Sequence, residues 1–277
     1  MALVQELDQK KSFIPAEIVS LLHASNIQLD ELKQWERFDH NPSEGYGRAV
    51  VHQGEHYEIM VMSWAPSDYS AAHNHGHANW GAVKVFGSLE HISYKLENNL
   101  ISISEKERLD PNTIIAINEK LIHQMGNPSA ENILSLHVYG TPKKVDYITG
   151  ESSLYEIGKH EIQFTNGGAF YDLPNNEILE RQPSLTADPL TEIHHYTQLL
   201  NLYHKSNFRG PQYNKAVSFF QSRSFENKFS FELDLDSKRV LYLIELKKAQ
   251  ELLKLLKEPT KIISDILGEL NDFENYS

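Results

Sequence analysis

The residues best suited to chemistry form a histidine-rich motif at residues 73–77, with the order His-Asn-His-Gly-His. If this segment is extended, His73, His75 and His77 share one face, so two imidazoles of one strand can reach one metal ion. Neutral imidazole suits Zn, Cu, Fe and Ni. Two ligands do not complete a site, and His123, beside a Gly-Asn turn, is the best-placed third ligand if its strand pairs nearby. The spacing therefore predicts a three-histidine metal centre.

A simpler interpretation is that histidines between Asn and Gly decorate a solvated loop. The neighbouring sequence favours the metal site, because strand-like runs precede and follow the motif, as a small β-barrel lined with ligands would require. The ligands do not choose the reaction. Three histidines on an octahedral ion leave room for a bidentate substrate and O2, but a hydrolytic Zn site also accepts three histidines and a water.

A second polar group follows the run of residues 132–140. Alternation puts aliphatic side chains on one face and Ser135, His137 and Tyr139 on the other. This line could supply a phenol ordered by an imidazole, which is itself ordered by a hydroxyl. Alternation does not say which face is buried, so a solvated surface is an equally open interpretation.

The sequence predicts that many short strands position these residues. Residues 15–38 predict one or two short helices, and from Gly45 the period changes to two, with Tyr46 and Arg48 on one face. Further strand patterns cover residues 57–64, 82–96, 100–104, 113–118 and 132–140. Because no helices alternate with these strands, they indicate an antiparallel double sheet or barrel rather than a parallel α/β fold.

The pattern changes after about residue 172, where we expect helices. Asp188 and Pro189 resemble an N-cap followed by a proline at the first helical position, and a further helix is expected near Pro211. Residues 240–257 and the segment after Pro259 are also helical in pattern. Their apolar stripes predict core or a partner interface rather than a cofactor site.

We therefore expect two domains, over residues 1–172 and over residues 173–277, the second being a mostly helical extension. The 277 residues include 40% hydrophobic side chains, which suffice for an ordinary core. No residue is a cysteine, so disulfides, thiolate metal sites and a cysteine nucleophile are excluded.

Charge and hydropathy narrow the partners. A net charge of −12 argues against nucleic acid, because like charges repel over the whole approach. The first residues are acidic where a signal peptide is basic, and no apolar run approaches the roughly 18 residues of a membrane span. We expect a cytoplasmic protein that binds small molecules, with no nucleic-acid or membrane partner.

The order and spacing of these motifs resemble the type I cysteine dioxygenase family, whose members are cupin-fold, non-haem iron thiol dioxygenases. The resemblance covers roughly residues 15–170. It is carried by Tyr46-X-Arg48, Trp64, His73-X-His75, Gly87, Leu121-X-His123 with Asn127, and Ser135-Leu136-His137-Val138-Tyr139. It implies a mainly β fold, a cupin (double-stranded β-helix or jelly-roll barrel), with short N-terminal helices and the C-terminal helical extension.

The resemblance also implies three groups of site residues. The ligands of Fe(II) would be His73, His75 and His123, with His77 a neighbour. The substrate carboxylate would be held by Arg48 and Tyr46. A polar triad beside the metal would consist of Ser135, His137 and Tyr139.

Two departures from the family pattern matter. Many cupins have a Glu ligand where this chain has Asn79, which agrees with the three-histidine branch. Animal members carry a cysteine that crosslinks to the triad tyrosine, and counting between His75 and Gly87 puts Trp80 at that position. Without any cysteine, Tyr139 cannot carry such a thioether.

The implied activity is addition of both atoms of O2 to the sulfur of L-cysteine, giving cysteine sulfinic acid, in cysteine metabolism. One alternative substrate is another thiol acid such as 3-mercaptopropionate, and another reading is a non-catalytic cupin that binds a metal or small ligand. The sequence leaves open the exact thiol, the oligomeric state and whether the chain is a fragment. The extension could mediate homo-oligomer formation, act as a lid or provide a docking surface.

Overall fold

The computed structural model divides the chain into two compact units. The barrel unit, as we name it, comprises Met1–Lys95, Ile103–Glu156 and Glu161–Ser184. The helical unit comprises Leu96–Ser102, Ile157–His160 and Leu185–Ser277. The residues that the structure describes are 2–41, 44–207, 209–210, 212–222, 225 and 236–272.

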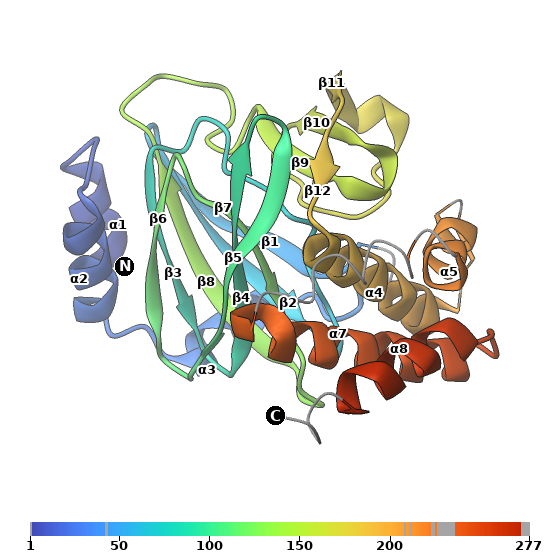
Figure 1. Ribbon diagram of the computed structural model, residues 1–277. Helices are drawn as coiled ribbons and strands as arrows, with labels where there is room; N and C mark the ends of the chain where they lie inside the picture. Colours follow the sequence, from blue (N-terminus) through green and yellow to red (C-terminus); the bar gives the residue numbers. More distant parts are fainter. Residues whose placement is uncertain are drawn as a thin grey trace. The chain divides into compact units, whose positions relative to one another are not determined.

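Short helices begin the barrel unit (Figure 1). They are α1 (Ala2–Asp8), α2 (Pro15–Ala24), α3 (Leu29–Leu32) and the 3-10 turn η1 (Lys33–Trp35). Pro15 begins α2 because its missing N–H is not needed in the first turn. The helices predicted within residues 15–38 are therefore present, whereas α1 precedes the predicted range.

A five-stranded antiparallel sheet forms one wall of the barrel, in the order β1-β2-β8-β3-β6. Its strands are β1 (Gly47–Gln53), β2 (Tyr57–Trp64), β8 (Ile133–Gly140), β3 (Trp80–Val85) and β6 (Ile114–Asn118). Alternate side chains of β2 and β8 join the helices in one hydrophobic core, so the intervening side chains face the barrel interior. This core includes Ile18, Leu22, Tyr57, Ile59, Val61, Trp80, Leu134, Leu136 and Val138.

A second sheet provides the facing wall. Strands β4 (Leu89–Glu97), β5 (Leu100–Leu109) and β7 (Ile122–Gly126) lie in the order β5-β4-β7, and the two-residue strand β12 (Thr186–Ala187) pairs parallel with β5 at the edge. Asn98 and Asn99 join β4 to β5 with positive φ angles of 51° and 65°, a left-handed conformation that suits a two-residue hairpin turn. These two sheets are those of a cupin barrel, so the predicted fold is confirmed.

A third, three-stranded sheet was not predicted from the sequence. It contains β9 (Ser152–Glu156), β10 (Glu161–Thr165) and β11 (Ile178–Pro183), with the 3-10 turns η2 (Ile157–Lys159) and η3 (Asn175–Glu177) near them in the chain. The pattern predicts helices after residue 172, which is wrong for β11 and for β12 (Thr186–Ala187). Residues 179–183 of β11 are exposed, so no buried apolar alternation marks this strand in the sequence.

The helical unit contains four described helices of nine residues or more. They are α4 (Pro189–Ser206), α5 (Tyr213–Gln221), α7 (Asp236–Leu255) and α8 (Lys261–Asp272). Asp188 caps α4 as predicted, its Oδ1 accepting the Thr191 N–H at 2.9 Å. Pro211, where a helix start is predicted, lies outside the described residues. None of the helices described is long and apolar enough to cross a bilayer.

Candidate metal centre

Backbone pairing fixes the position of the histidine motif. His73 and His123 exchange two backbone hydrogen bonds of 2.9 Å each, which places their side chains next to each other. Gly76 then turns the chain with a φ of +54°, and a Cβ there would clash with the Gly150 carbonyl oxygen. The predicted alternation therefore ends before His77, whose Nδ1 lies 4.0 Å from Glu151.

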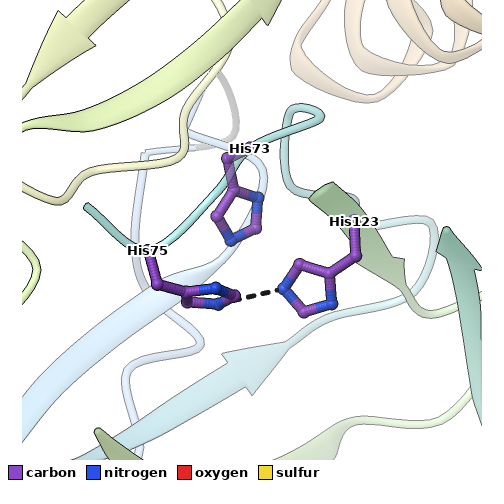
Figure 2. A group of neighbouring side chains, drawn as sticks. All are labelled: His73, His75 and His123. Atoms are coloured by element: carbon purple, nitrogen blue, oxygen red, sulfur yellow. Dashed lines mark hydrogen bonds between the residues drawn. The ribbon is translucent and has the colours of Figure 1, made fainter. Parts of the chain in front are cut away.

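Three imidazoles converge as predicted (Figure 2). The Nε2 atoms of His75 and His123 lie 3.1 Å apart, and one ligand nitrogen from each of His73, His75 and His123 lies within 4.8 Å of the others. Two nitrogens bound at right angles to one ion at about 2.1 Å would be about 3 Å apart. Among the described residues this is the one group of three or more side chains suited to a metal ion.

The protonation of these rings suits metal binding. Burial lowers the pKa of His73 to about 4 and holds the pKa values of His75 and His123 well below the usual value. The rings are therefore neutral at pH 7, which is the form that binds a metal ion. His73 Nδ1 donates to the Ala71 carbonyl at 2.8 Å, so the lone pair of His73 is on Nε2.

His123 has a different partner behind it. Its Nδ1 lies 3.0 Å from Nε2 of His91, and Nδ1 of His91 lies 2.9 Å from Oε1 of Glu107. Sequence reasoning missed both His91 and Glu107. Their contact depends on the order of β5, β4 and β7 in the sheet, and local periodicity carries no signal for strand order.

Ser135, His137 and Tyr139 form a buried hydrogen-bonded line along β8. Ser135 Oγ lies 2.7 Å from His137 Nε2, and His137 Nδ1 lies 2.7 Å from Tyr139 Oη. Trp64 Nε1 donates to Ser135 Oγ at 2.8 Å. All three side chains of the line are buried, so the alternative of a solvated face does not hold.

Burial sets the charge of this line. It lowers the pKa of His137 to about 3 and raises the pKa of Tyr139. His137 is therefore neutral and Tyr139 keeps its proton at pH 7. The Tyr139 ring lies 4.7 Å from the His75 ring, which places the end of the line beside the candidate metal ligands.

The residue opposite Tyr139 differs from the one expected by counting. Gly81 pairs with Tyr139, and a Cβ on Gly81 would lie 2.7 Å from the Tyr139 ring. Trp80 instead faces the hydrophobic core and donates from Nε1 to the Lys11 carbonyl at 3.1 Å. Trp80 therefore does not lie beside Tyr139, because successive strand residues point to opposite faces.

The two predicted substrate-binding residues lie in different surroundings. Tyr46 stacks on Trp64, with ring centroids 5.0 Å apart, and its Oη accepts the Ala169 N–H at 3.1 Å. Arg48 donates from Nε to the Met60 sulfur at 3.0 Å, and its Nη2 lies 3.8 Å from Glu58 Oε1.

Glu58 is a buried acid beside Arg48 that the sequence analysis did not single out. It is buried, and its Oε1 has no hydrogen-bond partner among the described residues. Burial raises the pKa of Glu58, and the Arg48 charge opposes that shift. The only sequence signal was one acidic residue inside the strongly apolar run of β2. Arg48 therefore has a protein carboxylate beside it even when no substrate is bound.

A partly open cavity lies beside the three candidate ligands and the end of the polar line. Polar lining residues include the three histidines, His137, Tyr139 and Tyr46. The apolar lining includes Met60, Met62, Trp64 and Met125. Ser135 and Arg48 are not in the lining; they lie behind His137 and Met60 respectively. A small substrate here would contact the candidate ligands, the phenol and a soft apolar wall.

The family model for cysteine dioxygenase type I matches residues 1–146, which is more than half of the chain. A double-stranded β-helix protein from Klebsiella pneumoniae subsp. pneumoniae MGH 78578 is 18% identical, with 43% of this chain and 91% of that chain covered and a TM-score of 0.33. An RmlC-like cupin from Desulfovibrio desulfuricans is 14% identical, with coverages of 42% and 98% and a TM-score of 0.32.

An oxalate oxidase, solved in complex with the substrate analogue glycolate, is also 14% identical. That match covers 38% of this chain and 57% of the oxidase, with a TM-score of 0.32. The facing sheets and the three-histidine group define a metal-binding cupin. The chain belongs to the cysteine dioxygenase type I family, a family of dioxygenases.

Proposed function

We propose that the protein is a thiol dioxygenase that converts L-cysteine to cysteine sulfinic acid. The reaction RSH + O2 → RSO2H balances without a further reductant, because both oxygen atoms end on the sulfur and O2 accepts the four electrons that the sulfur loses. One observation carries the proposal: three neutral imidazoles line a cavity that also contains the end of the Ser135-His137-Tyr139 line.

We propose Fe(II) as the metal, held by His73, His75 and His123 through their Nε2 atoms. The donor set fits, because neutral imidazole suits iron and all three rings remain neutral at pH 7. Fe(II), when bound, supplies the open coordination positions at which a thiol and O2 can react.

Tyr139 is the proposed proton donor on the cavity wall. Ser135 Oγ accepts from Trp64, and its own hydroxyl proton can then go to His137 Nε2. In this arrangement His137 donates from Nδ1 to Tyr139 Oη, which leaves the phenol proton for the cavity. The line would thus hold one O–H donor in a fixed direction beside the substrate.

We propose that Arg48 and Tyr46 bind the carboxylate of the substrate. A guanidinium fork pairs well with a carboxylate, which favours cysteine over a thiol that lacks one. Glu58 is 3.8 Å from Arg48, so a substrate carboxylate would compete with Glu58 for the same cation. Met60 and Met62 form an apolar cavity wall next to Arg48, and apolar surroundings strengthen any charge pairing.

Oxygen uptake across a panel of thiols tests the proposal. The iron-loaded protein would be given L-cysteine, cysteamine and 3-mercaptopropionate, with the product from labelled O2 identified by mass spectrometry. We expect the highest kcat/KM for L-cysteine and two labelled oxygens in its sulfinic acid. Faster turnover of 3-mercaptopropionate would assign the other thiol acid, and no thiol-dependent uptake by iron-loaded protein would favour a non-catalytic cupin.

We also propose that the protein acts in the cytosol on small molecules. The cytosol keeps thiols reduced, which maintains the supply of a thiol substrate. The net charge of −12 disfavours polyanionic partners.

A further inference from the structure

Three side chains from adjacent strands form a row behind one candidate metal ligand. Glu107 of β5, His91 of β4 and His123 of β7 are joined by contacts of 2.9 Å and 3.0 Å. His91 is buried, whereas the Glu107 side chain is 45% exposed. The row therefore runs from solvent to the ring of His123.

The chemistry of the groups sets the direction of each hydrogen bond. A carboxylate only accepts, so Nδ1 of His91 must donate to Glu107. Binding of a metal ion through His123 Nε2 requires the His123 proton on Nδ1, where the lone pair of His91 Nε2 can accept it. His123 then has its own lone pair on Nε2, the atom that faces Nε2 of His75.

We propose that Glu107 and His91 are positioning residues that hold His123 in the tautomer and orientation needed to bind the metal ion. This inference rests on the proposed metal centre. His91 is not a fourth ligand, because its Nε2 faces the ring nitrogen of His123 that points away from His75. Removing the hydrogen-bond partner of a metal-bound histidine typically lowers the metal affinity 10–100-fold.

The other two candidate ligands do not depend on a side chain in this way. His73 is oriented by the Ala71 backbone carbonyl, which no substitution removes. His75 Nδ1 has no hydrogen-bond partner in the part of the chain described. His123 is therefore the ligand whose orientation a substitution can change without touching the ligand itself.

Binding of Co(II) to the metal-free full-length protein, measured by competition with a chelator, tests the proposal. Glu107→Ala removes the acceptor of the row, and we expect Kd for Co(II) to rise about tenfold. Glu105→Ala is the matched control, because Glu105 is an exposed acid two residues away on the same strand. It removes the same charge and should leave Kd unchanged.

Substitutions of His91 provide a second, larger effect. His91→Phe deletes the acceptor for His123 and should raise Kd by 10–100-fold. His91→Gln should recover most of that loss, because its amide oxygen can accept the His123 Nδ1 proton. If His91→Phe does not fold, the partly exposed Glu107 still decides the question.

The melting temperature of the metal-free protein separates positioning from a structural role. We expect Glu107→Ala and Glu105→Ala to melt alike without metal and to differ in Co(II) affinity. Equal Co(II) affinity in wild type, Glu107→Ala and folded His91→Phe would overturn the inference, as would equal losses in Glu107→Ala and Glu105→Ala. Failure of the proposed function is a separate result, namely no thiol oxidation by a wild type that binds metal.

Discussion

Both units of the molecule bury histidines, but they use the ring nitrogens differently. In the barrel unit, the Nε2 atoms of His75 and His123 face each other across 3.1 Å. In the helical unit, His195 Nε2 accepts the Gly158 N–H at 3.1 Å, and His194 Nδ1 lies 3.2 Å from Glu245 Oε2. The His195 contact is to the backbone, and Glu245 Oε1 also lies 3.7 Å from Lys248 Nζ.

The comparison shows that buried polar residues alone do not mark a site. A buried ring usually has a partner, because an unpaired polar group inside a protein is costly. The helical histidines meet that need with a backbone N–H and with a carboxylate. In the barrel, three rings direct nitrogens without backbone donors toward one shared space, and that convergence is what a metal ion requires.

The largest expected effect would break the convergence itself. Changing His73, His75 or His123 to Ala should remove most of the bound iron, because ligands from two segments must share one ion. His77→Ala is the matched control from the same motif and should keep the iron. Metal analysis of the purified variants decides. Full iron retention in His123→Ala, or loss in His77→Ala, would reject the ligand assignment.

The next effect concerns the hydroxyl at the end of the polar line. Tyr139→Phe should lower kcat by 10²–10⁴-fold with unchanged iron content, because it deletes one oriented donor and no ligand. Tyr171→Phe is the control, since it deletes a buried hydroxyl bonded to Gln124 and outside the cavity lining. Equal turnover in wild type and Tyr139→Phe would leave the line with a packing role only.

A smaller effect is expected at Arg48. Losing a charge-assisted pair costs on the order of 1.5–3 kcal/mol, so Arg48→Gln should lower kcat/KM for L-cysteine roughly ten- to a hundredfold. Cysteamine has no carboxylate and should be affected less, so the gap between the two thiols narrows. Steady-state kinetics at matched iron content measures this gap in kcat/KM. An unchanged preference would mean that Arg48 does not bind the carboxylate.

Glu58→Gln should change the same preference in the opposite direction. The substitution removes the carboxylate that competes for Arg48, and pair energies on the order of 1 kcal/mol correspond to a KM for L-cysteine lowered about fivefold. KM for cysteamine should stay constant. A raised KM for L-cysteine would show instead that Glu58 holds Arg48 in its binding position.

The smallest expected effect concerns His195 of the helical unit and the pH dependence of stability. Burial lowers the pKa of His195 to about 3, whereas an unfolded histidine titrates near 6.5. Between these values the unfolded chain binds more protons, so stability falls as the pH falls. From pH 7 to pH 6 the loss from His195 is about 0.7 kcal/mol.

Urea unfolding at both pH values measures this loss. His195→Gln should show a shallower dependence than wild type. His204→Gln, which removes an exposed histidine of the same helix, is the matched control. Identical slopes in all three proteins would mean that His195 is not held neutral by the fold.

Sequence reasoning identified the groups that local geometry determines. Alternation put Ser135, His137 and Tyr139 on one face, but only pairing of β8 with both β2 and β3 decides that this face is buried. His73 and His75 were placed correctly, whereas the Gly76 turn ends the alternation before His77.

Long-range partners were beyond the sequence. Glu58 and His91 are single polar residues within strands, and their contacts depend on which strands become neighbours. Strand β11 has almost no buried face, so its residues lack the apolar period that identifies a strand. The local pattern does not determine strand order, and strand order decides which residues Glu58 and His91 contact.

The partly exposed position of Glu107 gives the site a control point outside its cavity. Residues in the cavity wall must satisfy substrate, metal and packing together, so few changes there are tolerated. A residue at the protein surface has no such burden. Substitutions at Glu107 would therefore let natural variation or an engineer adjust the metal centre in small steps, while the space that selects the substrate keeps its shape.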